Sequence, residues 1–344
     1  MRDYYANWDQ CPLSVVPVPE VLNPFRGDNV DLSVAVAGNL LYENIKCLTV
    51  LGLFQGAFAK GMLEGVHTLV EATSGNTGLL IKALAKPFGI KRAQLVVPPD
   101  IPEGKRHPLV MAGAELITAQ AGLSAIATAR NLGGGGWKAE GWQANNGCLN
   151  LDQYANPDGT TLHESFTGPK IVERAAYPPT VFAAGIGTGG TLVGVSRYLS
   201  KKIPKAKAVG VLLATGQEIP GVRDMPKLSE VSLAKNWLAS GGETVLIPTR
   251  PSYLAAIWFN QIMGIAAGPS SGFAYLGALK FLKKHKAAKT LHLLHDHQGR
   301  IHVVILFPDG NRPYGDRFMA NLPSYCLDVA VAPLPWEWPG NQIW

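Results

Sequence analysis

Two glycine-bracketed loops constrain this chain most strongly, because each lies between a strand pattern and a helix pattern. The first is Thr73-Ser74-Gly75-Asn76-Thr77-Gly78, and the second runs from Gly185 to Thr191 with the sequence GIGTGGT. A loop of this kind directs unpaired backbone N–H groups and hydroxyls toward whatever lies at the helix N-terminus, which is normally an anion. Two such loops indicate two anionic groups held together, such as a cofactor phosphate and a substrate carboxylate.

Strand and helix patterns alternate along most of the 344 residues, which is typical of a mainly parallel sheet covered by helices on both faces. We expect strands at 32–37, 68–71, 94–97, 114–117, 180–184, 208–213 and 301–307. We expect helices over 46–63, 77–88, 104–112, 122–132, 168–176, 190–200, 251–263 and 273–284. Glycines 133–136 lack the Lys-Ser/Thr of a P-loop, so they are interpreted as a helix C-cap and a flexible connection.

Composition excludes several function classes. The net charge of +6 is spread along the chain, without the basic stripe that a nucleic-acid-binding surface needs. No apolar run approaches the roughly 18 residues of a membrane helix, and the first residues lack the apolar core of a signal peptide. The 4 cysteines are scattered, without a disulfide framework or zinc-ligand spacing. We therefore expect a cytoplasmic protein that binds neither nucleic acid nor membrane.

The second loop formally matches the dinucleotide fingerprint, with glycines at 185, 187 and 190. That interpretation requires an acidic residue at the end of the next strand, where this chain has Leu212-Leu213-Ala214-Thr215. The loop better suits a phosphate monoester surrounded by backbone amides and two hydroxyls. The alternatives are glycines needed only for a tight turn and, in the first loop, Ser and Thr that serve only as helix caps.

Four motifs occur in order between residues 12 and 318: Glu71–Gly78; Leu151–Pro157 with His163 and Thr167–Ile171; Gly185–Thr191; and Gly268–Gly272. Together they resemble the cysteine synthase group of fold-type II pyridoxal-phosphate enzymes, which perform β-replacement. The resemblance implies an α/β protein of two three-layer αβα domains with mainly parallel sheets, similar to the tryptophan synthase β-like fold. It also implies a homodimer.

The same resemblance implies a domain organisation. Residues 1–46 with 152–318 would form a larger domain that anchors the coenzyme. Residues 47–151 would form a smaller, mobile subdomain that carries the first loop, and residues 319–344 are a tail rich in Pro and Trp.

Family chemistry requires a lysine that forms a Schiff base with the coenzyme and moves the substrate's α-proton. The family places it about thirty residues before the loop asparagine, and counting back from Asn76 reaches Lys46. Lys46 lies at the start of a predicted helix, where desolvation and the helix dipole favour a neutral amine. Its flank departs from the family's Ser-x-Lys-Asp-Arg, since Asn44 replaces Ser and Cys47-Leu48 replace Asp-Arg. Lys60 is the nearby competitor, and a non-catalytic protein that keeps only the fold is the alternative function.

The remaining site residues also follow from the resemblance. Pyridoxal 5'-phosphate is expected to be bound through its phosphate by the backbone and hydroxyls of Gly187, Thr188, Gly189, Gly190 and Thr191. Its 3-hydroxyl and its pyridine nitrogen are expected to meet Asn76 and Ser271, respectively. The substrate carboxylate is expected to be bound by Thr73, Ser74, Thr77 and Gln153. Arg223 is expected to bind an anionic leaving group, with a plain surface arginine as the alternative.

The predicted reaction is displacement on O-acetylserine or O-phosphoserine by sulfide, through an aminoacrylate, to give L-cysteine. Formation of cystathionine or diaminopropionate and dehydration of a hydroxy-amino acid are the alternatives. A histidine group at 292, 295, 297 and 302 could bind zinc. Its spacing instead predicts a strand, a turn at Gln298-Gly299 and a return strand, so no metal site is expected.

Overall fold

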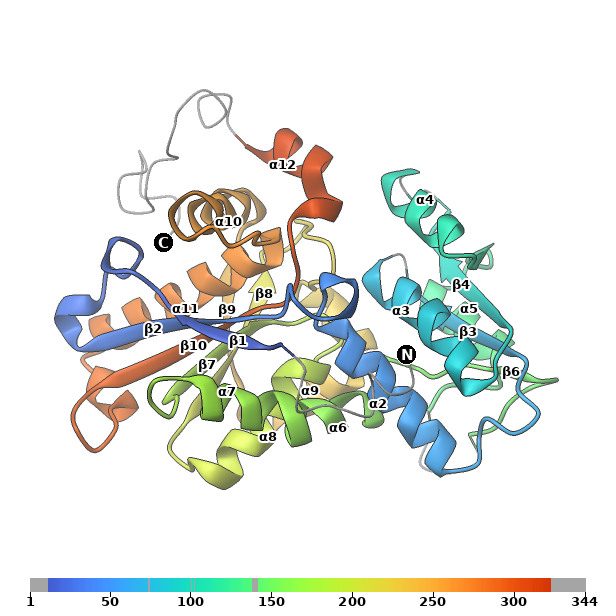
Figure 1. The fold of residues 1–344 in the computed structure, drawn as a ribbon, viewed down its shortest axis with the longest axis horizontal. Helices are drawn as coiled ribbons and strands as arrows, with labels where there is room; N and C mark the ends of the chain where they lie inside the picture. Colours follow the sequence, from blue (N-terminus) through green and yellow to red (C-terminus); the bar gives the residue numbers. More distant parts are fainter. Residues whose placement is uncertain (1–11, 74, 100, 102, 138–141, 323–344) are drawn as a thin grey trace. The chain divides into compact units, whose positions relative to one another are not determined.

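The computed structural model describes residues 12–73, 75–99, 101, 103–137 and 142–322. Within these residues the chain forms two compact units (Figure 1): a first unit, Lys46–Leu162, and a second unit, Pro12–Ile45 together with the residues from His163 onward. The chain returns to the second unit after residue 162, where the prediction placed the return at residue 152. Residues 152–162 belong to the first unit because the short helix at their end packs on its longest helix, with the Lys60 ammonium 2.5 Å from the Asp158 carboxylate.

The first unit is built on a parallel sheet with the strand order β5-β4-β3-β6. These strands are β3 (Thr68–Ala72), β4 (Arg92–Val97), β5 (Glu115–Thr118) and β6 (Cys148–Leu149). Its helices are α2 (Lys46–Ala59), α3 (Asn76–Ala85), α4 (Glu103–Met111), α5 (Ala125–Leu132) and α6 (Asp158–Leu162). Neighbouring residues of β4 point to opposite faces: Val96 packs with α5, whereas Leu95 packs with Leu109 of α4. Both faces of the sheet are therefore covered.

The second unit contains a sheet with the order β1-β2-β10-β7-β8-β9. Its strands are β1 (Ser14–Pro17), β2 (Val30–Val36), β7 (Val181–Gly185), β8 (Lys207–Leu213), β9 (Glu243–Ile247) and β10 (Ile301–Phe307). All are parallel except β1, which pairs antiparallel with β2. All seven residues of β10 are buried, as expected for a central parallel strand with helices on both sides.

Six α-helices complete the described part of the second unit: α7 (Gly168–Arg174), α8 (Gly190–Lys202), α9 (Ser232–Ala239), α10 (Thr249–Met263), α11 (Pro269–Ala287) and α12 (Gly315–Asn321). Figure 1 shows α10 and α11 on one side of this sheet and α7 and α8 on the other. The carboxyl ends of β7, β8 and β10 lie at the same edge, because these strands run parallel.

The α/β class with mainly parallel sheets is confirmed, and most predicted elements lie within a few residues of their observed bounds. One prediction is wrong: Leu291–Leu294 forms a 3-10 helix instead of the first strand of a hairpin. The chain turns tightly after α11, with Lys289 at φ 58° and the Thr290 amide bonded to the His285 carbonyl at 2.8 Å, so this segment does not extend along β10. Strands β1, β6 and β9 and helices α6, α9 and α12 were not anticipated.

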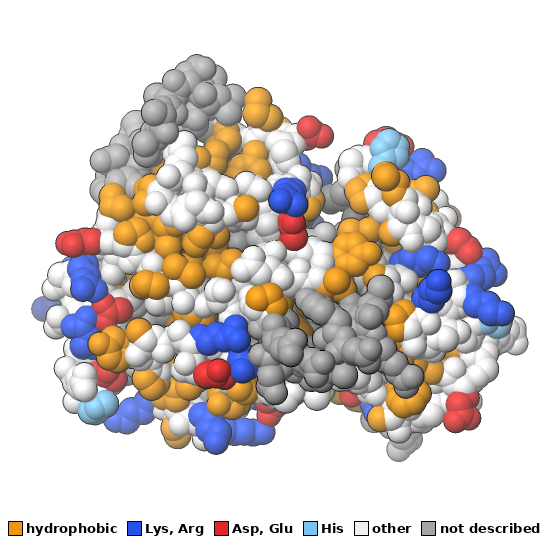
Figure 2. All heavy atoms as spheres, viewed as in Figure 1, with side chains coloured by type: hydrophobic (Ala, Val, Ile, Leu, Met, Phe, Trp, Pro, Cys, Tyr) orange, Lys and Arg blue, Asp and Glu red, His pale blue; other side chains and the backbone are white. Residues whose placement is uncertain are grey.

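Among the described residues, no helix is long and apolar enough to cross a membrane. On the face shown in Figure 2, Lys and Arg side chains lie at several separate places and have Asp and Glu side chains among them.

Candidate functional site

The second glycine loop connects β7 to α8 in the second unit. Its Ile186 amide donates to the Val211 carbonyl at 2.9 Å, which fixes the loop to the neighbouring strand β8. Gly189 caps α8 with φ 87°, and a Cβ there would lie only 3.0 Å from the Ala234 amide nitrogen. Both the left-handed conformation and the lack of space require glycine at this position. The first-turn N–H groups of α8 have no partners within the helix, so they are available to an anion.

Two threonine hydroxyls of this loop are buried and differ in their contacts. The Thr188 hydroxyl has no hydrogen-bond partner among the described residues. The Thr191 hydroxyl lies 3.3 Å from His163 Nε2, and His163 Nδ1 lies 3.0 Å from the Thr167 hydroxyl. The fully buried imidazole thus connects the loop to the π-helical turn His163–Thr167. His163 belongs to one of the four sequence motifs, but it was assigned no role from the sequence.

Ser271 lies in the first turn of α11, which the sequence had placed in a separate turn before the helix. Its side chain is 0% exposed, and its hydroxyl has no hydrogen-bond partner among the described residues. The start of α11 packs against the glycine loop, since a Cβ on Gly185 would lie 3.3 Å from Phe273. Arg223 also borders this loop: its amide donates to the Ile186 carbonyl at 2.8 Å, while its guanidinium lies 4.0 Å from Glu230.

These residues fit the two ends of pyridoxal phosphate. A buried hydroxyl without a partner costs free energy unless a ligand or water satisfies it. Thr188 together with the α8 N-terminus offers hydrogen bonds and a positive helix end, which suit a phosphate. Ser271 offers one hydroxyl from a fully buried helix turn, which suits a ring nitrogen.

In the first unit, the predicted substrate loop follows the carboxyl end of β3. Thr73 accepts a hydrogen bond from the Gly75 amide at 3.3 Å, and Asn76 is the first residue of α3. A Cβ on Gly78 would lie 2.6 Å from Leu95, so glycine is needed for α3 to approach the sheet. Thr77 is buried beside it. Ser74, which was predicted with this group, lies outside the described residues.

Gln153 belongs to the same group, because its side-chain amide donates to the Ala72 carbonyl at 3.0 Å, directly before Thr73. The Tyr154 hydroxyl donates to the same carbonyl at 3.2 Å. Behind them, burial raises the pKa of Glu71 to about 8, and the negative charge of Asp152 adds to the shift. Glu71 therefore carries a proton at neutral pH. Its role was not anticipated, since nothing in the local sequence shows that Asp152 lies beside it.

Lys46 is the first residue of α2, at the point where the chain enters the first unit. Cys47 and Leu48, which replace the polar pair of the family, are buried in this helix. Their apolar character is therefore consistent with their position. Lys60, the competitor, forms the ion pair with Asp158 described above.

The structure thus arranges the described predicted residues in two sets. The set in the first unit is Lys46, Thr73, Asn76, Thr77 and Gln153. The set in the second unit is Gly187, Thr188, Gly189, Gly190, Thr191, Arg223 and Ser271. Sequence reasoning missed Asp309, which lies beside Ser270 with 3.0 Å between the Ser270 hydroxyl and the carboxylate. A signal was present, because Asp309 closely follows the buried strand Ile301–Phe307.

The histidine group does not gather around one point. His302 Nε2 lies 2.9 Å from Asp296, and its ring stacks on Tyr177 with centroids 4.7 Å apart. Among the described residues, no group of three or more His, Cys, Asp or Glu side chains could hold a metal ion.

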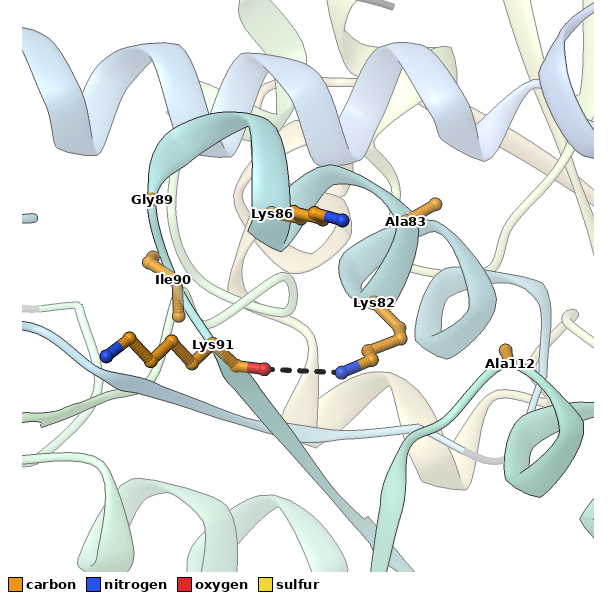
Figure 3. Close-up of a pocket in the computed structure, with 7 residues that line it drawn as sticks. All are labelled: Lys82, Ala83, Lys86, Gly89, Ile90, Lys91 and Ala112. Carbon is orange, nitrogen blue, oxygen red and sulfur yellow. Dashed lines mark hydrogen bonds between the residues drawn. The ribbon is translucent and has the colours of Figure 1, made fainter.

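A pocket of about 500 Å³ in the first unit contains none of the predicted site residues (Figure 3). Its lining includes Lys82, Lys86 and Lys91, near the C-terminal end of α3, where ammonium groups are favourable beside helix carbonyls. The Lys82 ammonium donates to the Lys91 carbonyl at 3.3 Å, and the Lys91 ammonium points away from it. We therefore do not place the functional site in this pocket.

Comparison with known proteins gives consistent results. Residues 44–296 match the family model described as pyridoxal-phosphate dependent enzyme. Cysteine synthase B of Escherichia coli K12 is 30% identical over 281 residues, which cover 81% of this chain and 88% of that protein. O-acetyl serine sulfhydrylase isoform 3 from Entamoeba histolytica superposes with a TM-score of 0.72 at 22% identity, covering 95% of this chain and 96% of that one. The O-acetylserine dependent cystathionine beta-synthase from Helicobacter pylori gives 0.71 at 21%, covering 90% and 96%.

Proposed function

Because the chain belongs to the family of pyridoxal-phosphate-dependent enzymes, we propose that it makes L-cysteine by β-replacement on an O-activated L-serine. The activated serine is O-acetylserine or O-phosphoserine, and the nucleophile is sulfide. Cysteine synthases at about 30% identity support this reaction class. The alternatives within the class differ in the nucleophile: homocysteine would give cystathionine, and an amine would give diaminopropionate.

The observation that carries the proposal is the buried Ser271 hydroxyl, which has no hydrogen-bond partner among the described residues. When bound, pyridoxal phosphate supplies an electron sink that stabilises negative charge at the α-carbon of an amino acid. A hydroxyl beside the ring nitrogen leaves that nitrogen largely unprotonated, whereas a carboxylate would protonate it. Ser271 therefore limits the sink and favours prompt loss of a β-leaving group over transamination.

The other residues have complementary roles in this proposal. With pyridoxal phosphate bound, Lys46 Nζ would hold the coenzyme and would accept the α-proton of the substrate. Thr188 and the amides at the start of α8 would hold the phosphate, and Asn76 would meet the 3-hydroxyl. Thr73, Thr77 and Gln153 bind the substrate carboxylate at the N-terminus of α3, where the helix dipole favours negative charge. Arg223 binds an anionic leaving group.

The test compares Lys46→Ala with Lys60→Ala as a matched control. The wild-type protein should be yellow, and borohydride should fix the coenzyme to a peptide that contains Lys46. Lys46→Ala should lose both the colour and cysteine formation, whereas Lys60→Ala should keep them. Colour that survives in Lys46→Ala but not in Lys60→Ala would contradict the assignment.

Substrate choice is tested by supplying O-acetylserine and O-phosphoserine. Each is combined in turn with sulfide, with homocysteine, or with an amine that would give 2,3-diaminopropionate. The proposal requires that, with O-acetylserine or with O-phosphoserine, sulfide gives a higher kcat/KM than the other nucleophiles. A yellow protein that is active only with homocysteine would keep the reaction class and contradict the product.

The homodimer, which the family resemblance implies, and the cytoplasmic location, which is expected from the sequence, also remain part of the proposal. Light scattering of the purified protein tests the first, and fractionation of the source cells tests the second.

A further inference from the structure

We propose that Asp309 is a positioning residue that fixes the segment leading into Lys46 against the helix turn that presents Ser271. This inference rests on the proposed function, because it concerns the residues that hold the coenzyme there. The described contacts that carry it lie within the second unit, up to Ile45, the residue that precedes the lysine.

The Asp309 side chain is 8% exposed and contacts three different segments of the second unit. Its Oδ1 accepts a hydrogen bond from the Ser270 hydroxyl at 3.0 Å. Its Oδ2 accepts from the Asn44 side-chain amide at 3.4 Å and from the Tyr314 hydroxyl at 2.5 Å. One carboxylate thus joins the residue directly before Ser271 to a residue two positions before Lys46.

Backbone hydrogen bonds connect the same segments. The Ile45 amide donates to the Pro308 carbonyl at 2.8 Å, and the Gly310 amide donates to the Glu43 carbonyl at 3.3 Å. On the other side, the Gly268 amide donates to the Asp309 carbonyl at 3.1 Å. A Cβ on Gly268 would lie 2.4 Å from Asp309 Oδ1, so the carboxylate packs directly on the start of α11.

The chemistry explains why a carboxylate is useful at this point. An ionised carboxylate accepts several hydrogen bonds at once, and bonds to a charged acceptor are stronger than neutral ones. The departure of Asn44 from the family's serine also has a reason here, since its amide supplies a donor that reaches Asp309. A carboxylate that only stabilised the N-terminus of α11 would affect that helix alone. A positioning role requires that loss of the carboxylate affects both the start of α11 and the segment before Lys46.

The test uses Asp309→Asn, with Asp296→Asn as the matched control. Asp296 is also mostly buried and also accepts side-chain and backbone hydrogen bonds, but it lies beside His302, away from the predicted site residues. Hydrogen exchange of the coenzyme-free proteins is followed at the Ile45 and Ser271 amides. The dissociation constant for pyridoxal phosphate is measured separately by the colour of the bound form.

In Asp309→Asn we expect exchange to rise at least about fivefold at both amides, because each segment opens more easily. We expect the dissociation constant to rise about tenfold. Asp296→Asn should change neither quantity. If Asp309→Asn does not fold, Asn44→Ala replaces it as the test variant. This variant removes only the hydrogen bond between Asp309 and the segment before Lys46. If Asp309 is a positioning residue, exchange should still become faster at the Ser271 amide as well.

Faster exchange at Ser271 alone, with the dissociation constant unchanged, would overturn the inference and leave a helix-stabilising role. Unchanged exchange at both amides would overturn it as well. A wild-type protein that binds no coenzyme would contradict the proposed function instead. The two failures are distinguishable because the exchange experiment needs no coenzyme.

Discussion

His163 Nε2 lies 3.3 Å from the hydroxyl of Thr191, while its other ring nitrogen lies 3.0 Å from the hydroxyl of Thr167. The imidazole therefore connects the end of the glycine loop to the π-helical turn His163–Thr167. This contact joins the start of the π-helical turn His163–Thr167 to the first turn of α8.

Replacement of His163 by alanine should weaken coenzyme binding. Loss of one buried hydrogen bond costs about 1 kcal/mol, which corresponds to roughly a fivefold higher dissociation constant. Titration of the coenzyme-free protein with pyridoxal phosphate measures this dissociation constant. His302→Ala is the control, because His302 is also buried but contacts Asp31 and Asp296. Equal weakening in both variants would contradict a specific role of His163.

Replacement of Ser270 by alanine should lower stability, whereas replacement of Ser271 should not. Ser271→Ala removes a buried hydroxyl without a partner among the described residues, so the coenzyme-free protein should be no less stable, and more stable by up to about 1 kcal/mol. Ser270→Ala removes the 3.0 Å hydrogen bond to Asp309 and should cost about 1 kcal/mol. Urea unfolding of the coenzyme-free proteins decides the sign. Ser271→Ala should also bind the coenzyme more weakly.

Replacement of Gly189 by alanine should destabilise the second unit by more than conformational strain alone. At φ 87°, a side chain costs about 1–2 kcal/mol, and its Cβ would also lie 3.0 Å from the Ala234 amide nitrogen. Gly216→Ala is matched in backbone conformation, with φ 78°, but nothing lies within 4 Å of its Cβ. Thermal unfolding should therefore show a larger loss for Gly189→Ala. Equal losses would show that the close approach has no energetic effect.

Replacement of Glu71 by glutamine should alter the pH dependence of stability. The pKa of Glu71 rises from 4.5 to about 8 in the folded protein, mainly because the side chain is buried. The folded state then keeps a proton that the unfolded state releases, so the free energy of unfolding falls as pH rises from about 4.5 to 8. The full effect is on the order of a few kcal/mol.

Glu71→Gln cannot titrate, so its stability relative to the wild-type protein should increase between pH 5 and pH 8, as measured by urea unfolding. Glu115→Gln is the control. The hydrogen bond from Arg92 lowers the pKa of Glu115 to about 2, so this carboxylate is ionised in the folded protein across the whole interval. A parallel increase in both variants would contradict the assignment to Glu71.

The sequence predicted the elements that carry strong local patterns. The strand before each glycine loop and the helix after it were found because apolar runs end at glycine and hydroxyl residues. The 3-10 turn at Leu291–Leu294 was mistaken for a strand, because four residues of mixed polarity fit several periods equally well. The half-exposed strand Glu243–Ile247 was missed for a related reason: its pairing with β8, which makes it a strand, is a tertiary contact.

The sequence could suggest candidate site residues only where they belong to motifs. Asp309 and Asn44 lie 265 residues apart, so no local pattern could reveal their hydrogen bond. The raised pKa of Glu71 likewise depends on Asp152 and on burial by the whole first unit. Motifs identify which residue types are present, but the fold decides which of them meet.

Strand β10 lies between β2 and β7, although it is the last strand of the sheet to be synthesised. Until residues 301–307 have left the ribosome, the β1–β2 ribbon has no partner through which to join β7, β8 and β9. At about 10 residues per second, synthesis from the end of β7 at Gly185 to the end of β10 at Phe307 takes roughly 12 seconds. During this interval the edges of β2 and β7 that pair with β10 have unpaired backbone N–H and C=O groups, so we expect a nascent chain stalled before β10 to be prone to aggregation.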